Sequence, residues 1–191
     1  MKKLKFLPLL GAALLASCAT HENMDMVTDD AGYPHYTVQY QDDTRGQSVF
    51  PMQREATGKK LFIFDPKAGA WAAYDAQGHR VMTGSASGGM DYCKDIHQGC
   101  RTVTGTYAVF DKKGPDCTSH EYPIRADGTE GGAKMPYCMH FYQGYAIHAA
   151  YEVPTYNSSH GCIRVLPGAA KWLHDNFIDV GTTVIVLPYS S

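Results

Sequence analysis

His148 and Cys162 are residue types that carry nucleophilic catalysis, and thirteen residues, 149–161, separate them in the chain. A thiolate is the reactive form of cysteine, and it needs a nearby base or positive charge to form at neutral pH. A histidine at the end of a strand can supply that base where the loop after it folds back. The alternative is a disulfide cysteine beside an uninvolved histidine, which is the more common arrangement in secreted proteins.

The neighbours of Cys162 favour catalysis. Gly161 has no side chain beside the sulfur, so a substrate backbone can approach and N–H groups can face an oxyanion. Arg164 lies two residues beyond the cysteine on an expected strand, so it points to the same face as the sulfur. Its guanidinium suits a substrate carboxylate or, alternatively, braces the loop. The segment therefore combines a nucleophile, an anion-binding backbone and a cation.

Residues 159–164 read Ser-His-Gly-Cys-Ile-Arg and resemble, at every position, the signature of the YkuD-type L,D-transpeptidase catalytic domain. That family has a histidine, a variable loop, Ser or Thr followed by His-Gly-Cys, an apolar residue, and Arg or Asn. Residues 61–65, 101–107 and 134–148 also resemble family segments, so the resemblance covers about residues 59–188. Three departures concern Val103, where proline is usual, Ala149, where Gly or Ser is usual, and a short loop between His148 and Ser159.

By this resemblance Cys162 is the nucleophile and His148 the general base, with a backbone carbonyl beside the histidine as third member of the triad. The backbone N–H groups of His160, Gly161 and Cys162 form the oxyanion hole. The donor is a peptidoglycan tetrapeptide stem: the thiolate attacks the carbonyl of its third residue, D-Ala leaves, and the acyl group passes to an amine. Two alternatives stay open, an L,D-carboxypeptidase or hydrolase on the same substrate, and a non-catalytic lipoprotein that binds the wall or a host.

Three further side chains are assigned to substrate binding or to bracing of the loop, namely Arg164, Ser159 and Tyr137. Most aromatic residues at positions such as 137 simply belong to the core. The ring of His160 is expected to be structural, because the family uses its backbone. The resemblance implies no metal and no organic cofactor, and we expect a monomer whose partners are peptidoglycan stem peptides.

The sequence holds six cysteines, and four of them are candidates for disulfides. Cys93, His97 and Cys100 lie close enough in sequence to suggest a zinc site, but no second ligand pair is apparent. An oxidising compartment favours a disulfide instead. Four cysteines allow three pairings, and proximity in sequence favours Cys93 with Cys100 and Cys117 with Cys138.

Residues 1–17 resemble a lipoprotein signal peptide. Lysines near the start precede an apolar run, residues 6–16, which is shorter than the roughly 20 residues of a membrane span. Residues 15–18, Leu-Ala-Ser-Cys, resemble a bacterial lipobox, which implies cleavage before Cys18 and lipidation of its sulfur. Residue 19 is not aspartate, which in enterobacterial-type sorting implies the outer membrane. We therefore expect an outer-membrane lipoprotein on the periplasmic side of a Gram-negative-type envelope; the alternative is an ordinary signal peptide that contains a cysteine.

The elements that position the site are expected from residue 59 onward. The chain has 191 residues, which suits one domain, and a formal charge of −2 gives no reason to expect nucleic acid as a partner. Residues 18–58 are polar and predict a tether, with a strand near residues 36–40 and packing on the domain left open.

Residues 59–191 predict a mainly β catalytic domain, an L,D-transpeptidase-like sandwich or barrel. We expect strands at residues 60–64, 70–74, 79–85, 102–110 (a broken pair), 138–142, 145–148 and 182–187, and one prominent helix near the C-terminus at 168–177.

Overall fold

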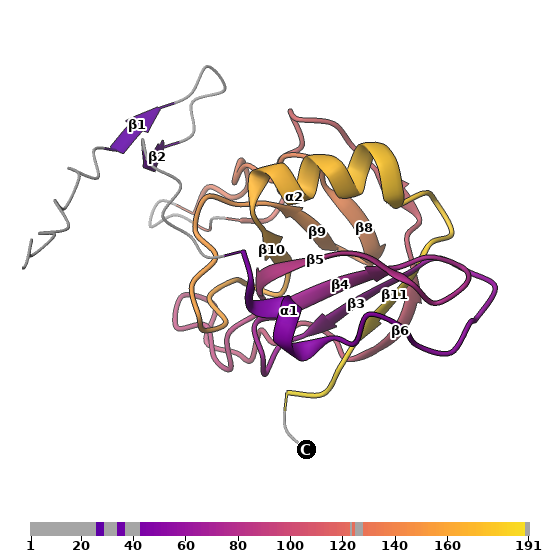
Figure 1. The fold of residues 1–191 in the computed structure, drawn as a ribbon. Coiled ribbons are helices and arrows are strands. Elements are labelled where there is room, and N and C mark those ends of the chain that lie inside the picture. Colours follow the sequence, from indigo (N-terminus) through magenta and orange to yellow (C-terminus); the bar gives the residue numbers. More distant parts are fainter. Residues whose placement is uncertain (1–25, 29–33, 37–42, 123, 125–127, 190–191) are drawn as a thin grey trace, which may run out of the picture.

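A curled sheet of nine strands dominates the computed structural model, which describes residues 26–28, 34–36, 43–122, 124 and 128–189 (Figure 1). The strand order is β6-β11-β3-β4-β5-β10-β9-β8-β7. Strand β10 runs parallel to β9 and β11 parallel to β3, and the other neighbours are antiparallel. The prediction of a mainly β domain is confirmed. The strands are β3 Leu61–Asp65, β4 Ala70–Tyr74, β5 Arg80–Ser87, β6 Gly105–Ala108, β7 Asp111–Lys112, β8 Met139–Tyr142, β9 Tyr145–Ala149, β10 Ile163–Val165 and β11 Thr183–Val186.

The predicted pair of strands at residues 102–110 is wrong, because only β6 forms there. The N–H of Thr102 is donated to the hydroxyl of Tyr189 at 2.9 Å, so it joins no strand ladder. Beyond β6 the chain changes neighbours: the N–H of Val109 is donated to Thr182, and that of Phe110 to His140 of β8. The segment therefore passes from one part of the curled sheet to another instead of turning back on itself.

One continuous helix near the C-terminus covers the sheet (Figure 1), and it consists of α2 Pro167–Trp172 and the π-helix η1 Leu173–Phe177. In the wider final turn the N–H of Ile178 is donated to the carbonyl of Leu173, five residues earlier, at 2.7 Å. Lys112 Nζ donates to the carbonyls of His174 and Ile178 at 2.6 and 2.5 Å, which suits the negative end of a helix. Five apolar residues predict the buried face of this helix. Four of them, Ala169, Ala170, Leu173 and Phe177, are buried in the main core, and Trp172 is partly buried against it.

Part of the predicted tether packs on the domain as a short helix, α1 Arg45–Val49, and not as a strand. Arg45 donates to the carbonyls of Val153 and Pro154 at 2.7 and 3.0 Å. Phe50 is buried in a second apolar cluster on β3 and β4. Residues 43–50 therefore contribute to the folded unit.

Two further strands, β1 Met26–Thr28 and β2 Pro34–Tyr36, pair with each other in antiparallel fashion. The predicted strand at residues 36–40 lies almost entirely outside the described residues, as do the signal peptide and Cys18. Within the described ranges, no helix is both long and apolar enough to cross a membrane.

Candidate active site

Three neighbouring strands place polar side chains on one face of the sheet. Arg164 of β10 is paired with Ser87 of β5 on one side and with His148 of β9 on the other. Paired residues on adjacent strands share a face, and so do residues two apart on one strand. Cys162, two residues before Arg164, therefore lies on the same face as His148. The structure places Cys162 directly before β10 and His148 on the adjoining strand β9.

His148 is held in one tautomer by the backbone. It is 6% exposed, and its Nδ1 lies 2.8 Å from the carbonyl oxygen of Ala149. A carbonyl can only accept, so Nδ1 carries the proton and Nε2 has the lone pair that a general base needs. Burial lowers the pKa of His148 to about 4, although the hydrogen bond to Ala149 acts in the opposite direction. The imidazole is therefore neutral at physiological pH.

Cys162 is the free cysteine among those that the structure describes, and it is partly exposed. Its Sγ lies 3.7 Å from the carbonyl oxygen of Gly144. Burial of the sulfur raises the pKa of Cys162, while a backbone hydrogen bond at Ala146 and the charge of Arg164 lower it in part. Thiol and imidazole are thus both neutral at rest, rather than a preformed ion pair.

Ser159 holds the turn that carries the cysteine. This side chain is buried, and its Oγ donates to the carbonyl of Cys162 at 2.6 Å and accepts from the N–H of Gly161 at 3.0 Å. The bracing role predicted for Ser159 matches these contacts. The N–H of Gly161, one of the three predicted oxyanion-hole donors, is therefore donated within the turn itself.

Gly161 is required at its position. Its φ of 126° is one that other residues rarely adopt, and a Cβ there would lie 2.5 Å from the ring of Tyr145. The Tyr145 ring therefore packs directly over the backbone next to Cys162. Sequence reasoning missed Tyr145, and only the close approach to Gly161 identifies it.

The ring of His160 is held from two sides. Its Nε2 lies 2.7 Å from Oδ2 of Asp95, and its centroid lies 4.5 Å from that of Tyr122. These partners are far away in sequence, and no local motif marks either of them. The ring is therefore a structural link between the loop at residues 93–100 and the segment at residue 122.

Arg164 and Ser87 brace the loop that connects His148 to Cys162. Arg164 Nη1 donates to Ser158 Oγ at 3.2 Å. Ser87 Oγ donates to the carbonyl of Tyr156 at 2.8 Å and accepts from the Ser158 N–H at 3.1 Å. Arg164 therefore contacts the loop that leads to Cys162, and its role toward a substrate stays a prediction.

Among the remaining predicted residues, the Cys117–Cys138 disulfide belongs to a small buried cluster against which Cys162 packs, whereas Tyr137 lies at the C-terminal helix. Tyr137 packs against the C-terminal helix: its ring lies 5.6 Å from that of His174, and Lys171 Nζ lies 5.6 Å from its centroid. Both favoured disulfides are present, Cys93–Cys100 and Cys117–Cys138. Cys93 lies within 4.8 Å of Asp95 and His160 in a group of potential ligands, but its sulfur is in the disulfide and cannot serve as a thiolate.

The chain belongs to the L,D-transpeptidase catalytic domain family, YkuD, whose model matches residues 59–186. An L,D-transpeptidase structure from Xylanimonas cellulosilytica is 25% identical with a TM-score of 0.59, over 74% of this chain and 66% of that one. One from Mycobacterium smegmatis is 25% identical with a TM-score of 0.53, over 68% and 59%. The chain thus spans less than two thirds of these structures. No curated protein matches it.

Proposed function

We propose that the chain is a peptidoglycan L,D-transpeptidase that forms an acyl-enzyme on Cys162. The observation that carries this proposal is the neutral His148, whose Nδ1–H is bound by Ala149 and which shares a face with the thiol. The fixed tautomer leaves the lone pair of Nε2 free to take the thiol proton. Membership of the family supports the same class of reaction.

The proposed reaction has two transfers. As Sγ of Cys162 attacks the carbonyl carbon of the third stem residue, its proton moves to Nε2 of His148. The tetrahedral oxyanion collapses, the C–N bond breaks, and D-Ala leaves with the proton from the imidazolium. An acceptor amine then gives a proton to His148 and attacks the thioester, and the released sulfur takes that proton back. Because both groups are neutral at rest, proton transfer accompanies each attack.

The cellular setting is part of the proposal. We propose cleavage before Cys18, lipidation of that residue, and anchoring in the outer membrane with the domain on the periplasmic side as a monomer. The apolar run before Cys18 supports this placement. Labelling of cells with a fatty acid tests it: label is expected in the wild type, and its retention in Cys18→Ala would contradict the proposal.

Products made from disaccharide-tetrapeptides test the reaction. The wild type is expected to give cross-linked dimers and free D-Ala, and Cys162→Ala neither. Free disaccharide-tripeptide without dimers would instead identify an L,D-carboxypeptidase. Turnover by Cys162→Ala would contradict the assigned nucleophile. If neither protein acts on the tetrapeptide, the non-catalytic alternative replaces the proposal.

A further inference from the structure

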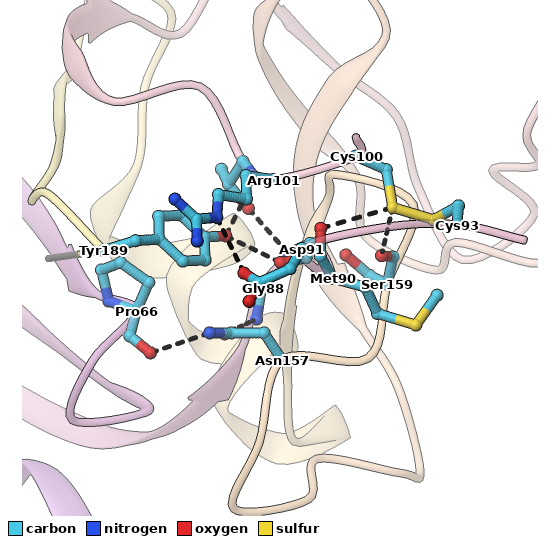
Figure 2. A network of polar contacts seen from close by, with 12 residues as sticks. Pro66, Gly88, Met90, Asp91, Cys93, Cys100, Arg101, Asn157, Ser159 and Tyr189 are labelled. Carbon is cyan, nitrogen blue, oxygen red and sulfur yellow. Dashed lines mark hydrogen bonds and ion pairs between the residues drawn. A yellow bond between two sulfur atoms is a disulfide. The ribbon is translucent and has the colours of Figure 1, made fainter. Parts of the chain in front are cut away.

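A cavity of about 570 Å³ lies beside the loop that leads to Cys162. It is bordered by four segments that are distant in sequence: the turn between β3 and β4 with Pro66 and Lys67, the loop after β5, the loop between β9 and β10, and the C-terminal segment. Figure 2 shows how several of these residues converge. The residues of this groove that matter here are Tyr92, Tyr156, Tyr189, Asp91, Arg101 and Asn157.

Aromatic rings form much of the groove. Tyr92 is 54% exposed and Tyr156 is 69% exposed, so both present apolar surface to solvent. The ring of Tyr189 is fixed, because its hydroxyl donates to the Gly89 carbonyl at 3.0 Å and accepts from the Thr102 N–H at 2.9 Å. The groove therefore combines one fixed ring with two exposed ones.

The groove is lined by three charged side chains, Lys67, Arg101 and Asp91, whose charges sum to one positive charge. Asn157 Nδ2 donates to the carbonyl of Pro66 at 3.0 Å, and its Oδ1 accepts from the N–H of Gly88 at 2.9 Å (Figure 2). Arg101 pairs with Asp91 at 2.7 Å, and its guanidinium lies 5.1 Å from the ring centroid of Tyr189. A preformed site with flat rings and planar polar groups suits a neutral, hydroxyl-rich ligand.

The groove is tied to the catalytic turn through Ser159. The backbone of Ser159 donates to the Gly88 carbonyl and accepts from the Met90 N–H, both at 2.9 Å, while its hydroxyl donates to the Cys162 carbonyl. The Cys93–Cys100 disulfide lies beside Met90 and Ser159 (Figure 2), and Cys100 Sγ lies 3.4 Å from the Met90 carbonyl oxygen. A ligand in the groove is therefore held at a fixed offset from the nucleophile.

We propose that this groove binds N-acetylated sugars of the glycan strand, separately from the site that takes the stem peptide. This rests on the proposed function, because the glycan carries the stems that reach Cys162. Tyrosine rings stack on the apolar faces of sugar rings, and the arginine, aspartate and amide groups bond hydroxyl and acetamido groups. Binding there holds the strand while its stem reacts.

The test uses the full chain carrying Cys162→Ala, so that no chemistry follows binding, and the neutral N-acetylglucosamine tetramer as probe. Calorimetry is expected to show binding that changes little between about 0.05 and 0.5 M salt, because the tetramer carries no charge. Tyr156→Ala and Tyr92→Ala are each expected to weaken it by about tenfold through loss of a stacking ring. Tyr156→Phe retains the ring and is expected to retain binding.

Phe110→Ala is the matched control, since Phe110 is 53% exposed but lies outside the groove. Absence of tetramer binding, or equal binding by all variants, would overturn the proposal. Turnover of the stem peptide by the wild type is measured separately. Sugar binding without turnover would contradict the proposed reaction, and turnover without sugar binding would contradict the proposed role of the groove.

Discussion

Strands β9 and β10 have one apolar face and one polar face, because successive side chains along a strand point to opposite sides of the sheet. On one face Ile147, Ile163 and Val165 are fully buried in the main core. On the other, His148 and Arg164 lie side by side with Cys162 before them. The same two strands therefore contribute residues to the main core on one face and the side chains of His148 and Arg164 on the other.

The difference between the faces explains the electrostatics of the site. His148 is 6% exposed although it lies on the face opposite the main core, and its Nδ1 lies against the carbonyl of Ala149. Burial then lowers the pKa of His148 and raises that of Cys162. Mutations on the apolar face are expected to change stability, and mutations on the polar face to change reactivity.

The largest effect is expected for His148→Gln. Removing the base is expected to slow acylation of Cys162 by a carbapenem by roughly 10²–10⁴-fold. The free energy of unfolding at pH 7 is expected to change little, because the position keeps a polar group of similar size. Acylation at the wild-type rate would show that His148 is not the base.

Ile147→Ala tests the opposite face of the same strand. Ile147 has no exposed surface, so truncation is expected to cost about 2–5 kcal/mol of stability through lost burial and a cavity. Denaturant unfolding measures the cost. The acylation rate of the folded fraction is expected to stay within a few-fold of the wild type; a loss as large as that of His148→Gln would erase the distinction between the faces.

The pH dependence of stability reports on His148 directly. The unfolded chain takes up the proton near pH 6.5 and the folded protein only near pH 4, so the unfolded state binds more protons between these values. Stability is therefore expected to fall by about 3 kcal/mol as the pH drops through that window. The same titration on His148→Gln isolates this contribution, and identical curves for both proteins would contradict the buried neutral imidazole.

Ser87→Ala is expected to have the smallest effect. Ser87 is fully buried, and its loss leaves the Tyr156 carbonyl and the Ser158 N–H without this partner. A cost of about 1–3 kcal/mol is expected. Because these bonds hold the loop before Cys162, acylation is also expected to slow by a few-fold, and an effect on stability alone would show that the loop holds its place without them.

Most of the strands were predictable because their signals are local. Strand β4 matches its prediction at both ends, since Asp65 and Gly69 set the turn before it, with Asp65 Oδ1 accepting from the backbone of Lys67 at 2.9 Å. The sequence also predicts that Cys162 and Arg164 share a face, because residues two apart on a strand point to the same side of the sheet. That His148 on β9 pairs with Arg164 on β10 could be seen only in the folded structure, because the sequence does not show which strands are neighbours.

What sequence reasoning missed depends on distant contacts. Helix α1 has few helical signals of its own, and Arg45 holds it through carbonyls more than a hundred positions away. Asp95 reaches His160 across 65 positions. The π-helical end of the C-terminal helix is held by Lys112, which is likewise remote from it. No periodicity or short motif contains such information.

The assignment of Cys162 as the nucleophile is tested most directly by intact-mass measurement after exposure to a carbapenem. We expect one adduct per molecule in the wild type, located on Cys162 by peptide mapping, and none in Cys162→Ala, with both disulfides retained. An unmodified wild-type protein whose Cys162 is shown to be reduced, or an adduct that persists in Cys162→Ala, would contradict it.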